Sequence, residues 1–406
     1  MFFRTRRLDE HVDLNDVCRG DGMLFVRDGV GAAGRGSVAV VNEDDLDRVL
    51  AGLQPVDGEA PPHGHGPHLF GVVPFLPREA ARFVLPRAVV TKDADGQCWV
   101  TVIGADPASL TDEEFDNAVE EALRTAQPVV TANSYSVSPV TSVDAYLAAV
   151  GAARDAVRAG QLLKAVIARD ISVTALEPID IHAVLLRLRA SFGSSYRFCV
   201  DGLIGASPEL LVQVQGRTVR SHPLAGTAPR TGDPSTDSRL AADLVASTKN
   251  QVEHRVVIDM VHDTLLPWCS YLDWEPEPSI VTVANVQHLG TAIEGALSEP
   301  RPPVMTLVRA LCPTPALGGS PSAGAIEFIE THEPMQRGNY GGAVGIVDRH
   351  GDGTFAVTIR CAEFSADRRT ARLFAGGGIV AESDPLAELA ETQAKFQAML
   401  SAIVRP

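Results

Sequence analysis

Short strands and helices follow one another closely from residue 141 onward, and several strands arrive in adjacent pairs. This order restricts the fold more than any other feature of the chain. The patterns predict helices over 142–160, 181–192, about 236–266 and from Ser383, and strands over 163–173, 197–200, 210–214, 217–220, 341–347, 355–361 and 370–374. The segment His350-Gly351-Asp352-Gly353 is typical of a hairpin turn. Strand pairs joined by hairpins and separated by helices favour α+β layers over a purely parallel sheet.

Residues 1–140 carry a sparser pattern of the same kind. We expect strands over 24–26, 37–41 and 98–103, a short helix over 43–53 and an extended connector over 128–139. The chain has 406 residues, of which 45% are hydrophobic, and this is enough to bury a large core in one big domain or two ordinary ones.

Charge and composition exclude several classes of partner. The chain has 35 basic and 51 acidic residues, and its net charge of −16 argues against nucleic acid or an anionic membrane as the main partner. It has no apolar run long enough for a membrane span, and no apolar stretch of a signal peptide follows its basic first residues. The six cysteines are scattered without a Cys-x-x-Cys pair, which predicts reduced thiols and a cytoplasmic location. An anionic ligand would need nearby cations or a metal to offset the charge.

Three motifs carry weaker signals. The segment from Gly29 to Gly34 fits G-x-G-x-x-G, but a dinucleotide-binding oxidoreductase needs a helix directly after it, and a strand pattern follows instead. His63, His65 and His68 lie in a loop rich in Pro and Gly; a metal cluster is one interpretation, and a solvated turn is favoured because this loop gives ligands no rigid frame. The glycines 376–378 follow a strand and indicate either a tight turn or close approach of the backbone to a ligand.

Two ionisable residues stand next to apolar runs. Strand alternation places Lys164 on one face with Val166 and Ala168, where its amine either reaches solvent or loses its proton and becomes a competent base. Glu209 follows a Gly-Ala-Ser-Pro turn and precedes an apolar strand, so it is either a solvated turn residue or a carboxyl that keeps its proton, as a general acid requires.

Other charged residues have both an ordinary and a functional interpretation. Glu253 falls beside the apolar stripe of its helix, where a buried carboxylate needs a cation. Glu388, Glu391 and Lys395 share one helix face, which is either a solvated Glu-to-Lys face or part of a Mg²⁺ site. Arg360 at the end of a strand would bind a carboxylate ligand or form a structural ion pair.

Taken in order, these residues and their neighbours resemble one family, the chorismate-utilising enzymes, which comprise isochorismate, salicylate, anthranilate and aminodeoxychorismate synthases. The matching segments are Lys164–Arg169, Gly205–Leu210, Pro223–Thr227, Lys249–His254, Gln287–Leu289, Pro313–Gly319, Arg337–Tyr340, Thr358–Arg360, Ala375–Ile379, Ser383–Pro385 and Glu388–Lys395. The first 140 residues lack a recognisable motif, including the Leu-Leu-Glu-Ser element of feedback-regulated anthranilate synthases. We therefore expect one chorismate-binding enzyme domain over 1–406, with its motif-bearing core at 142–400.

The resemblance implies a fold, a cofactor and a set of site residues. The fold would be α+β and like that of anthranilate synthase component I, with two stacked β-sheets and helices outside. Mg²⁺ would be held on the C1 carboxylate of chorismate by Glu253, Glu388 and Glu391. The catalytic residues would be Lys164, Glu209 and His288. Arg360 and Tyr340 would bind the enolpyruvyl carboxylate, and the other substrate contacts would come from Gly226, Thr227, Leu317, Gly376, Gly377, Gly378 and Lys395, the last also orienting the metal-ligand helix.

The residue at position 164 distinguishes members of this family. Those that use ammonia resemble one another in having glutamine there, whereas this chain has Lys164. Water is a poor nucleophile and needs a base, so lysine indicates attack by water at C2 of chorismate. By resemblance, Glu209 would protonate the departing C4 hydroxyl.

The segment Pro313–Gly319 resembles isochorismate synthases more than salicylate synthases, and residues 345–348 and 358–362 favour the same branch. We therefore predict an isochorismate synthase, with a salicylate synthase, which goes on to eliminate pyruvate, as the alternative. A non-catalytic chorismate-binding regulator would have lost Lys164, Glu209 or a metal glutamate, and all are present. The expected partner is chorismate alone, bound by a monomer without a glutamine amidotransferase subunit. Whether the product feeds menaquinone, a siderophore or another metabolite stays open.

Overall fold

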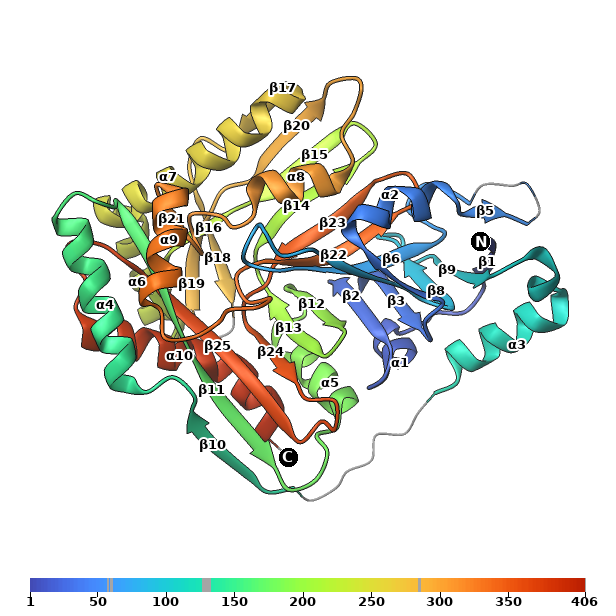
Figure 1. The fold of residues 1–406 in the computed structure, drawn as a ribbon, viewed down its shortest axis with the longest axis horizontal. Coiled ribbons are helices and arrows are strands. Elements are labelled where there is room, and N and C mark those ends of the chain that lie inside the picture. The colour runs from blue at the N-terminus through green and yellow to red at the C-terminus, as the bar shows by residue number, and fades with distance from the viewer. Residues whose placement is uncertain (57, 59–60, 126–132, 284–285, 406) are drawn as a thin grey trace.

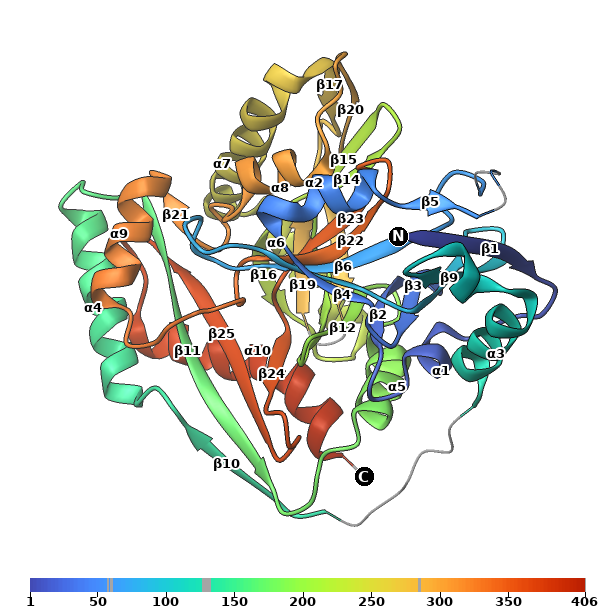
Figure 2. The same cartoon turned by 45° about the vertical axis from the view of Figure 1, so that its right-hand side comes forward.

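The computed structural model describes residues 1–56, 58, 61–125, 133–283 and 286–405, and the side chains of Lys249 and Glu253 lie outside what it describes. Figures 1 and 2 show β-sheets at the centre of the molecule and helices around them. The sequence prediction of an α+β fold with stacked sheets and outer helices is confirmed.

The first large sheet has 13 strands among the described residues. Its order is β10 (Tyr135–Pro139), β11 (Lys164–Ala175), β25 (Thr370–Ile379), β24 (Cys361–Phe364), β13 (Leu203–Ser207), β12 (Tyr196–Val200), β2 (Met23–Arg27), β3 (Val30–Arg35), β8 (Ala88–Lys92), β9 (Cys98–Gly104), β1 (Phe2–Leu8) and β5 (Gln54–Pro55), with β21 (Gly319–Ser320) also paired to β11. The long antiparallel pair β11–β25 forms one wall of the site described below.

The second large sheet has nine described strands, in the order β17 (Cys269–Trp274), β20 (Ile293–Leu297), β15 (Thr218–His222), β14 (Leu210–Gln215), β23 (Gly353–Val357), β22 (Ala343–Asp348), β6 (His68–Val73), β7 (Arg82–Leu85) and β4 (Ala39–Asn42). A small third sheet contains β16 (Leu224–Pro229), β19 (Val286–Gly290) and β18 (Ser279–Val283). The two large sheets share one core, in which Phe25 and Phe198 of the first belong to the same cluster as Phe70 and Phe355 of the second.

The helices are α1 (Leu14–Cys18), α2 (Glu43–Ala51), α3 (Asp112–Leu123), α4 (Val143–Arg158), α5 (Ile181–Phe192), α6 (Pro234–Ala246), α7 (Thr248–Leu265), α8 (Val304–Leu311), α9 (Ser322–His332) and α10 (Pro385–Val404), with short 3₁₀ turns at Pro107–Leu110 and Leu266–Trp268. The structure places α4 and α9 near the β11–β25 pair, with α10 beneath β25 (Figure 1). No helix among the described residues is long and apolar enough to cross a membrane.

Several element boundaries differ from the sequence prediction. The single helix expected over 236–266 is wrong, because Ser247 has extended dihedrals and its side chain caps α7 at the amide of Asn250. The single strand expected over 355–361 is also wrong, because it is interrupted before Cys361 by Arg360, whose φ is +52°. The last helix begins at Pro385, after its cap Asp384, rather than at Ser383.

The three weaker motifs also have clear outcomes. The segment from Gly29 to Gly34 lies in the β2–β3 hairpin, so the helix that dinucleotide binding requires is absent from this described stretch. The glycines 376–378 do not form a tight turn, since β25 continues through them opposite β11. His63 is exposed, but His68 is buried in β6, so the solvated-turn interpretation fails for His68. Among the described residues, no three His, Cys, Asp or Glu side chains are arranged to hold a metal.

The strands of the first third pair directly with those of the rest. In the first large sheet β2 pairs with β12, and in the second β6 pairs with β22. Of the extended connector expected over 128–139, residues 128–132 lie outside the described part, and β10 occupies 135–139. All six cysteines are free thiols.

Candidate active site

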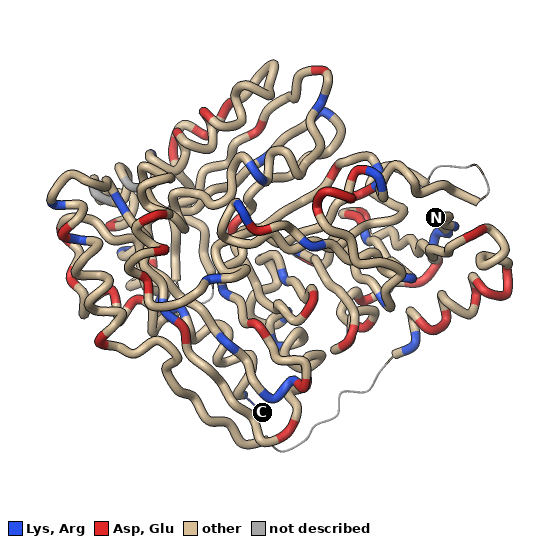
Figure 3. The backbone as a smooth tube through the Cα atoms, in the orientation of Figure 1, with Lys and Arg blue, Asp and Glu red and all other residues tan. Residues whose placement is uncertain are grey.

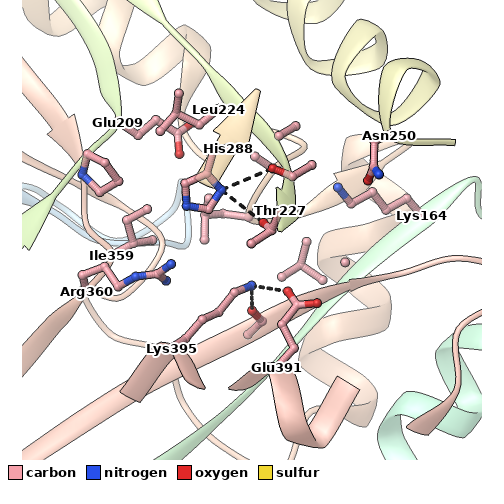
Figure 4. Close-up of a pocket in the computed structure, with 18 of the residues that line it drawn as sticks. Lys164, Glu209, Leu224, Thr227, Asn250, His288, Ile359, Arg360, Glu391 and Lys395 are labelled. Atoms are coloured by element: carbon pink, nitrogen blue, oxygen red, sulfur yellow. Dashed lines mark hydrogen bonds and ion pairs between the residues drawn. The ribbon is translucent and has the colours of Figure 1, made fainter. Parts of the chain in front are cut away.

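One cavity of about 320 Å³ collects most of the residues that the sequence indicated. It is lined by Lys164, Glu209, Gly226, Thr227, His288, Leu317, Tyr340, Arg360, Gly376, Gly378, Glu388, Glu391 and Lys395. These residues are up to 231 positions apart in the chain (164 to 395), so the fold brings them together from the first large sheet, the small sheet, α10 and the loops between strands. Figure 4 shows ten of the lining residues with labels.

The alternation of β11 explains why Lys164 points into this cavity. Ala165 and Ile167 face the other side and pack in the core that includes Tyr146 of α4 and Ile329 of α9. Lys164 and Val166 therefore face the cavity. Lys164 is 7% exposed, so its amine is held inside the protein.

Glu209 enters the cavity from a different side than Lys164 (Figure 4). It follows β13 and is 3% exposed. Burial raises the pKa of Glu209 to about 8, and a hydrogen bond from the backbone of Leu224 and the charges of Lys164 and Arg360 only partly oppose this. The carboxyl is therefore mostly protonated near pH 7, which is the state that a general acid needs.

His288 of β19 is a neutral imidazole. Burial, together with the nearby cations Arg360 and Lys395, lowers its pKa to about 3. Its Nδ1 lies 3.1 Å from Thr227 Oγ1 and 3.3 Å from the Gly226 carbonyl oxygen (Figure 4). Because a carbonyl oxygen only accepts, Nδ1 carries the ring hydrogen, and Nε2 is left as an acceptor.

Arg360 provides a cation on the cavity wall. It is 8% exposed, and burial lowers its pKa, although the nearby Tyr340, Glu391 and Glu209 favour its charged form. Among the described residues, no carboxylate lies within ion-pair distance of its guanidinium, so the structural ion pair considered from the sequence is absent there. Burial also raises the pKa of the neighbouring Tyr340, whose ring stacks on Phe374 with centroids 5.4 Å apart. A phenol and a guanidinium on the same wall suit a carboxylate ligand.

Helix α10 presents carboxylates to the same cavity. Glu388 and Glu391 are one turn apart, and Glu391 Oε1 lies 2.6 Å from Lys395 Nζ, which also donates to the Gly376 carbonyl oxygen at 2.7 Å (Figure 4). The Lys395 charge holds the pKa of Glu391 below its usual range, so Glu391 is ionised. The Glu-to-Lys pair considered for this helix is present between Glu391 and Lys395, and both residues also line the cavity.

Two of the indicated residues do not line the cavity as described. Gly377 lies between two lining glycines and faces α10, where a Cβ atom would come within 2.7 Å of Glu388 Oε2. The side chain of Glu253 lies outside the described residues. Seven further lining residues had not been assigned to the site: Val166, Pro208, Leu224, Ala225, Asn250, Ala316 and Ile359. All of them fall inside the motif segments, so position within a motif was the available signal.

The cavity is lined by basic residues, although the molecule as a whole is acidic. Acidic residues are spread over the outer elements, including α3 (Figure 3), in agreement with the net charge of −16. Arg360 and Lys395 both line the cavity. Local positive charge of this kind is what an anionic ligand would need in an acidic protein.

The fold and this site define a chorismate-binding enzyme. Residues 43–404 match the family described as chorismate binding enzyme, and the chain belongs to that family. It is 38% identical over 348 residues to the isochorismate synthase DhbC of Bacillus subtilis, an alignment that covers 83% of this chain and 81% of that protein.

Two solved structures share the fold. The menaquinone-specific isochorismate synthase MenF of Escherichia coli superposes with a TM-score of 0.82 at 24% identity, covering 98% of this chain and 94% of that one. Anthranilate synthase component I of Streptococcus pneumoniae gives 0.74 at 22% identity, covering 98% and 92%. The expected likeness to anthranilate synthase component I is thus confirmed for the fold.

Proposed function

We propose that the chain is an isochorismate synthase, which isomerises chorismate by adding water at C2 and releasing the hydroxyl at C4. The observation that carries this is the pair Lys164 and Glu209, both buried and on different sides of one cavity, with the Glu209 carboxyl protonated. The likeness to DhbC supports the same reaction.

In this mechanism each residue has one role. Acting as a base requires the neutral form of Lys164, which then takes a proton from the water that attacks C2, and Glu209 gives its proton to the hydroxyl that leaves C4. The reverse reaction needs the two groups in exchanged states, so the enzyme should work in both directions. Arg360 and Tyr340 bind the enolpyruvyl carboxylate, while neutral His288, fixed by Gly226 and Thr227, offers an acceptor at Nε2.

Mg²⁺ fits the carboxylates on α10. Mg²⁺ is a hard cation that binds one or two carboxylates and keeps several waters, and Glu388 and ionised Glu391 supply such oxygen ligands on one wall. We propose that they hold Mg²⁺ together with Glu253, with Lys395 orienting Glu391. Bound there, the ion would neutralise a carboxylate of the substrate.

Glu391→Gln is expected to raise the Mg²⁺ concentration needed for half-maximal activity, or to abolish turnover, because an amide replaces an anionic ligand. The measurement is the initial rate across a Mg²⁺ titration, with circular dichroism to show an intact fold. Glu327→Gln, at an exposed position of α9, is the control and should leave the titration unchanged. An unaltered Mg²⁺ dependence in Glu391→Gln would remove Glu391 from the metal site.

Product analysis distinguishes the two related reactions. Purified protein incubated with chorismate and Mg²⁺ is expected to give a mixture of chorismate and isochorismate, read by chromatography, because the reaction is reversible. Stoichiometric release of pyruvate would instead establish a salicylate synthase. An absence of any conversion, with chorismate bound, would support a non-catalytic regulator.

The remaining expectations stay predictions. We infer one enzyme domain over the whole chain, since strands of the first third are integrated into both large sheets. A monomer without a glutamine amidotransferase subunit accords with the use of water rather than ammonia. The cytoplasmic location rests on the cysteine pattern alone.

A further inference from the structure

A buried ion pair lies directly behind the candidate active site. Glu333 follows the last residue of α9, and its Oε2 lies 2.6 Å from Nη2 of Arg337. Nε of Arg337 donates a second hydrogen bond to Glu333 Oε1 at 2.7 Å, so the contact is bidentate. The Arg337 and Glu333 side chains are 2% and 0% exposed, and neither is among those that line the cavity.

The other hydrogen bonds of this pair go to the backbone of the cavity wall. Arg337 donates from Nη2 to the Val166 carbonyl oxygen and from Nη1 to the Leu317 carbonyl oxygen, each at 2.7 Å. Glu333 Oε2 accepts from the amide of Ala168 at 2.8 Å. Val166 and Leu317 both line the cavity, and Val166 lies two residues from Lys164 on the same face of β11. The pair therefore bonds the strand that carries Lys164 to the turn that carries Leu317.

Arg337 itself is held in place by its surroundings. Its guanidinium lies over the Phe75 ring, 4.2 Å from the centroid. Its carbonyl oxygen accepts from the amide of Tyr340 at 3.0 Å, in the turn that brings Tyr340 to the cavity. A guanidinium with five donors in a planar fork can bind a carboxylate and two carbonyls at once, whereas a lysine ammonium cannot reproduce that geometry.

Few direct backbone links join the Leu317 turn to β11 among the described residues. They are the short pairing of β21 with Lys164 and Ala165, the bond from the Leu163 amide to Ser320, and one hydrogen bond of 3.0 Å from the Val166 amide to the Gly318 carbonyl oxygen. The Arg337 fork adds a link that these backbone contacts do not make, because it bonds the Leu317 carbonyl oxygen and the Val166 carbonyl oxygen to one guanidinium. Misplacing a catalytic group by about 1 Å can cost on the order of 100-fold in rate.

We propose that Glu333 and Arg337 form a positioning pair that fixes Lys164 and the Leu317 turn in the geometry needed for attack by water. Neither residue touches substrate, and the pair acts through the backbone of Val166 and Leu317. This inference rests on the proposed isochorismate synthase reaction. It gives a role to two residues that take no part in the proposed proton transfers.

Arg337→Lys tests the pair because it keeps the buried positive charge for Glu333 but loses the fork. We expect kcat for isochorismate formation to fall at least about tenfold, with KM for chorismate changed less than about threefold, since Arg360 and Glu391 are untouched. Hydrogen exchange of amides in residues 314–320 should become faster in the same variant. If Arg337→Lys does not fold, the uncharged double variant Glu333→Gln with Arg337→Gln replaces it and is expected to behave alike.

The matched control is Arg372→Lys. Arg372 also binds a buried carboxylate of β11, with Nε 2.6 Å from Asp170 Oδ2, but it is not bonded to the cavity wall at Val166 or Leu317. The kcat of Arg372→Lys, and the hydrogen exchange of its amides in residues 314–320, should stay near the wild-type values. An equal loss of kcat in both variants, or normal kcat in Arg337→Lys, would overturn the positioning role. A wild-type enzyme that forms no isochorismate would overturn the proposed function instead, and the exchange measurement would still decide whether the pair holds the turn.

Discussion

Lys164→Ala is expected to lower kcat for isochorismate formation by at least about 100-fold, because a positioned general base contributes about 10²–10⁴-fold in rate. Lys164 faces the cavity from β11 and is 7% exposed, so the substitution removes a buried lysine and not a solvated one. Chorismate binding should be largely retained, since Arg360 and the carboxylates of α10 stay in place. Stopped-time assays of isochorismate by chromatography give kcat, and calorimetric titration gives chorismate affinity.

The control for this variant is Lys92→Ala, which removes a lysine on β8 outside the cavity. Its kcat should equal that of the wild type. Near-normal turnover in properly folded Lys164→Ala would contradict the role of Lys164 as the base. It would also remove the main reason for choosing water over ammonia as the nucleophile.

The site was more predictable from the sequence than the boundaries of the elements around it. Lys164, Glu209 and Arg360 were each ambiguous alone, and it was the ordered series of motifs that indicated a common site. Strand alternation correctly placed Lys164 and Val166 on one face, because a period of two is a local property of the chain. What each motif contacts across the fold is not local. The sequence therefore placed Arg337, Val166 and Leu317 in motif segments but did not indicate the hydrogen bonds between them.

The break in the strand before Cys361 shows the same limit. Local propensity predicts one strand over residues 355–361, yet Arg360 adopts φ of +52°, which is uncommon for a residue with a side chain. Its carbonyl oxygen accepts a hydrogen bond from the amide of Ala206 on β13, more than 150 positions away in the chain (206 to 360). Such a conformation persists when the surrounding structure determines it, and strained residues gather at functional sites. Here the break accompanies the turn of the Arg360 guanidinium to the cavity.

Glu209→Gln is expected to lower kcat by at least about 100-fold as well, because the amide cannot give a proton to the departing C4 hydroxyl. Combining it with Lys164→Ala should be no more than slightly worse than either change alone, since both groups serve one displacement. In the wild type, activity should fall as pH rises through about 8, where Glu209 loses its proton. Initial rates of the single and double variants at pH 7, and a wild-type pH profile, test these three points. A double variant about 100-fold slower than either single variant would show that the two residues act independently.

The raised pKa of Glu209 also predicts that the stability of the fold depends on pH. This dependence tests the protonation of Glu209 independently of catalysis. Its pKa is about 8 in the folded protein against an ordinary 4.5, so between these values the folded state holds a proton that the unfolded state has released. The stability that Glu209 contributes is thus fully present below about pH 4.5 and is lost as pH rises through about 8, at up to about 1.4 kcal/mol per pH unit.

The amide introduced by Glu209→Gln cannot titrate, so this substitution should remove the loss of stability that Glu209 causes as the pH rises. Thermal unfolding at pH 6 and at pH 8.5 is expected to show a smaller fall in Tm for Glu209→Gln than for the wild type, even though the variant is nearly inactive. The Tm of Glu327→Gln, a change at an exposed position, should fall as much as the Tm of the wild type. Equal falls in Tm for Glu209→Gln and the wild type would mean that the carboxyl is already ionised at pH 6. An ionised carboxyl could not protonate the leaving hydroxyl, so that result would assign the general acid to another group.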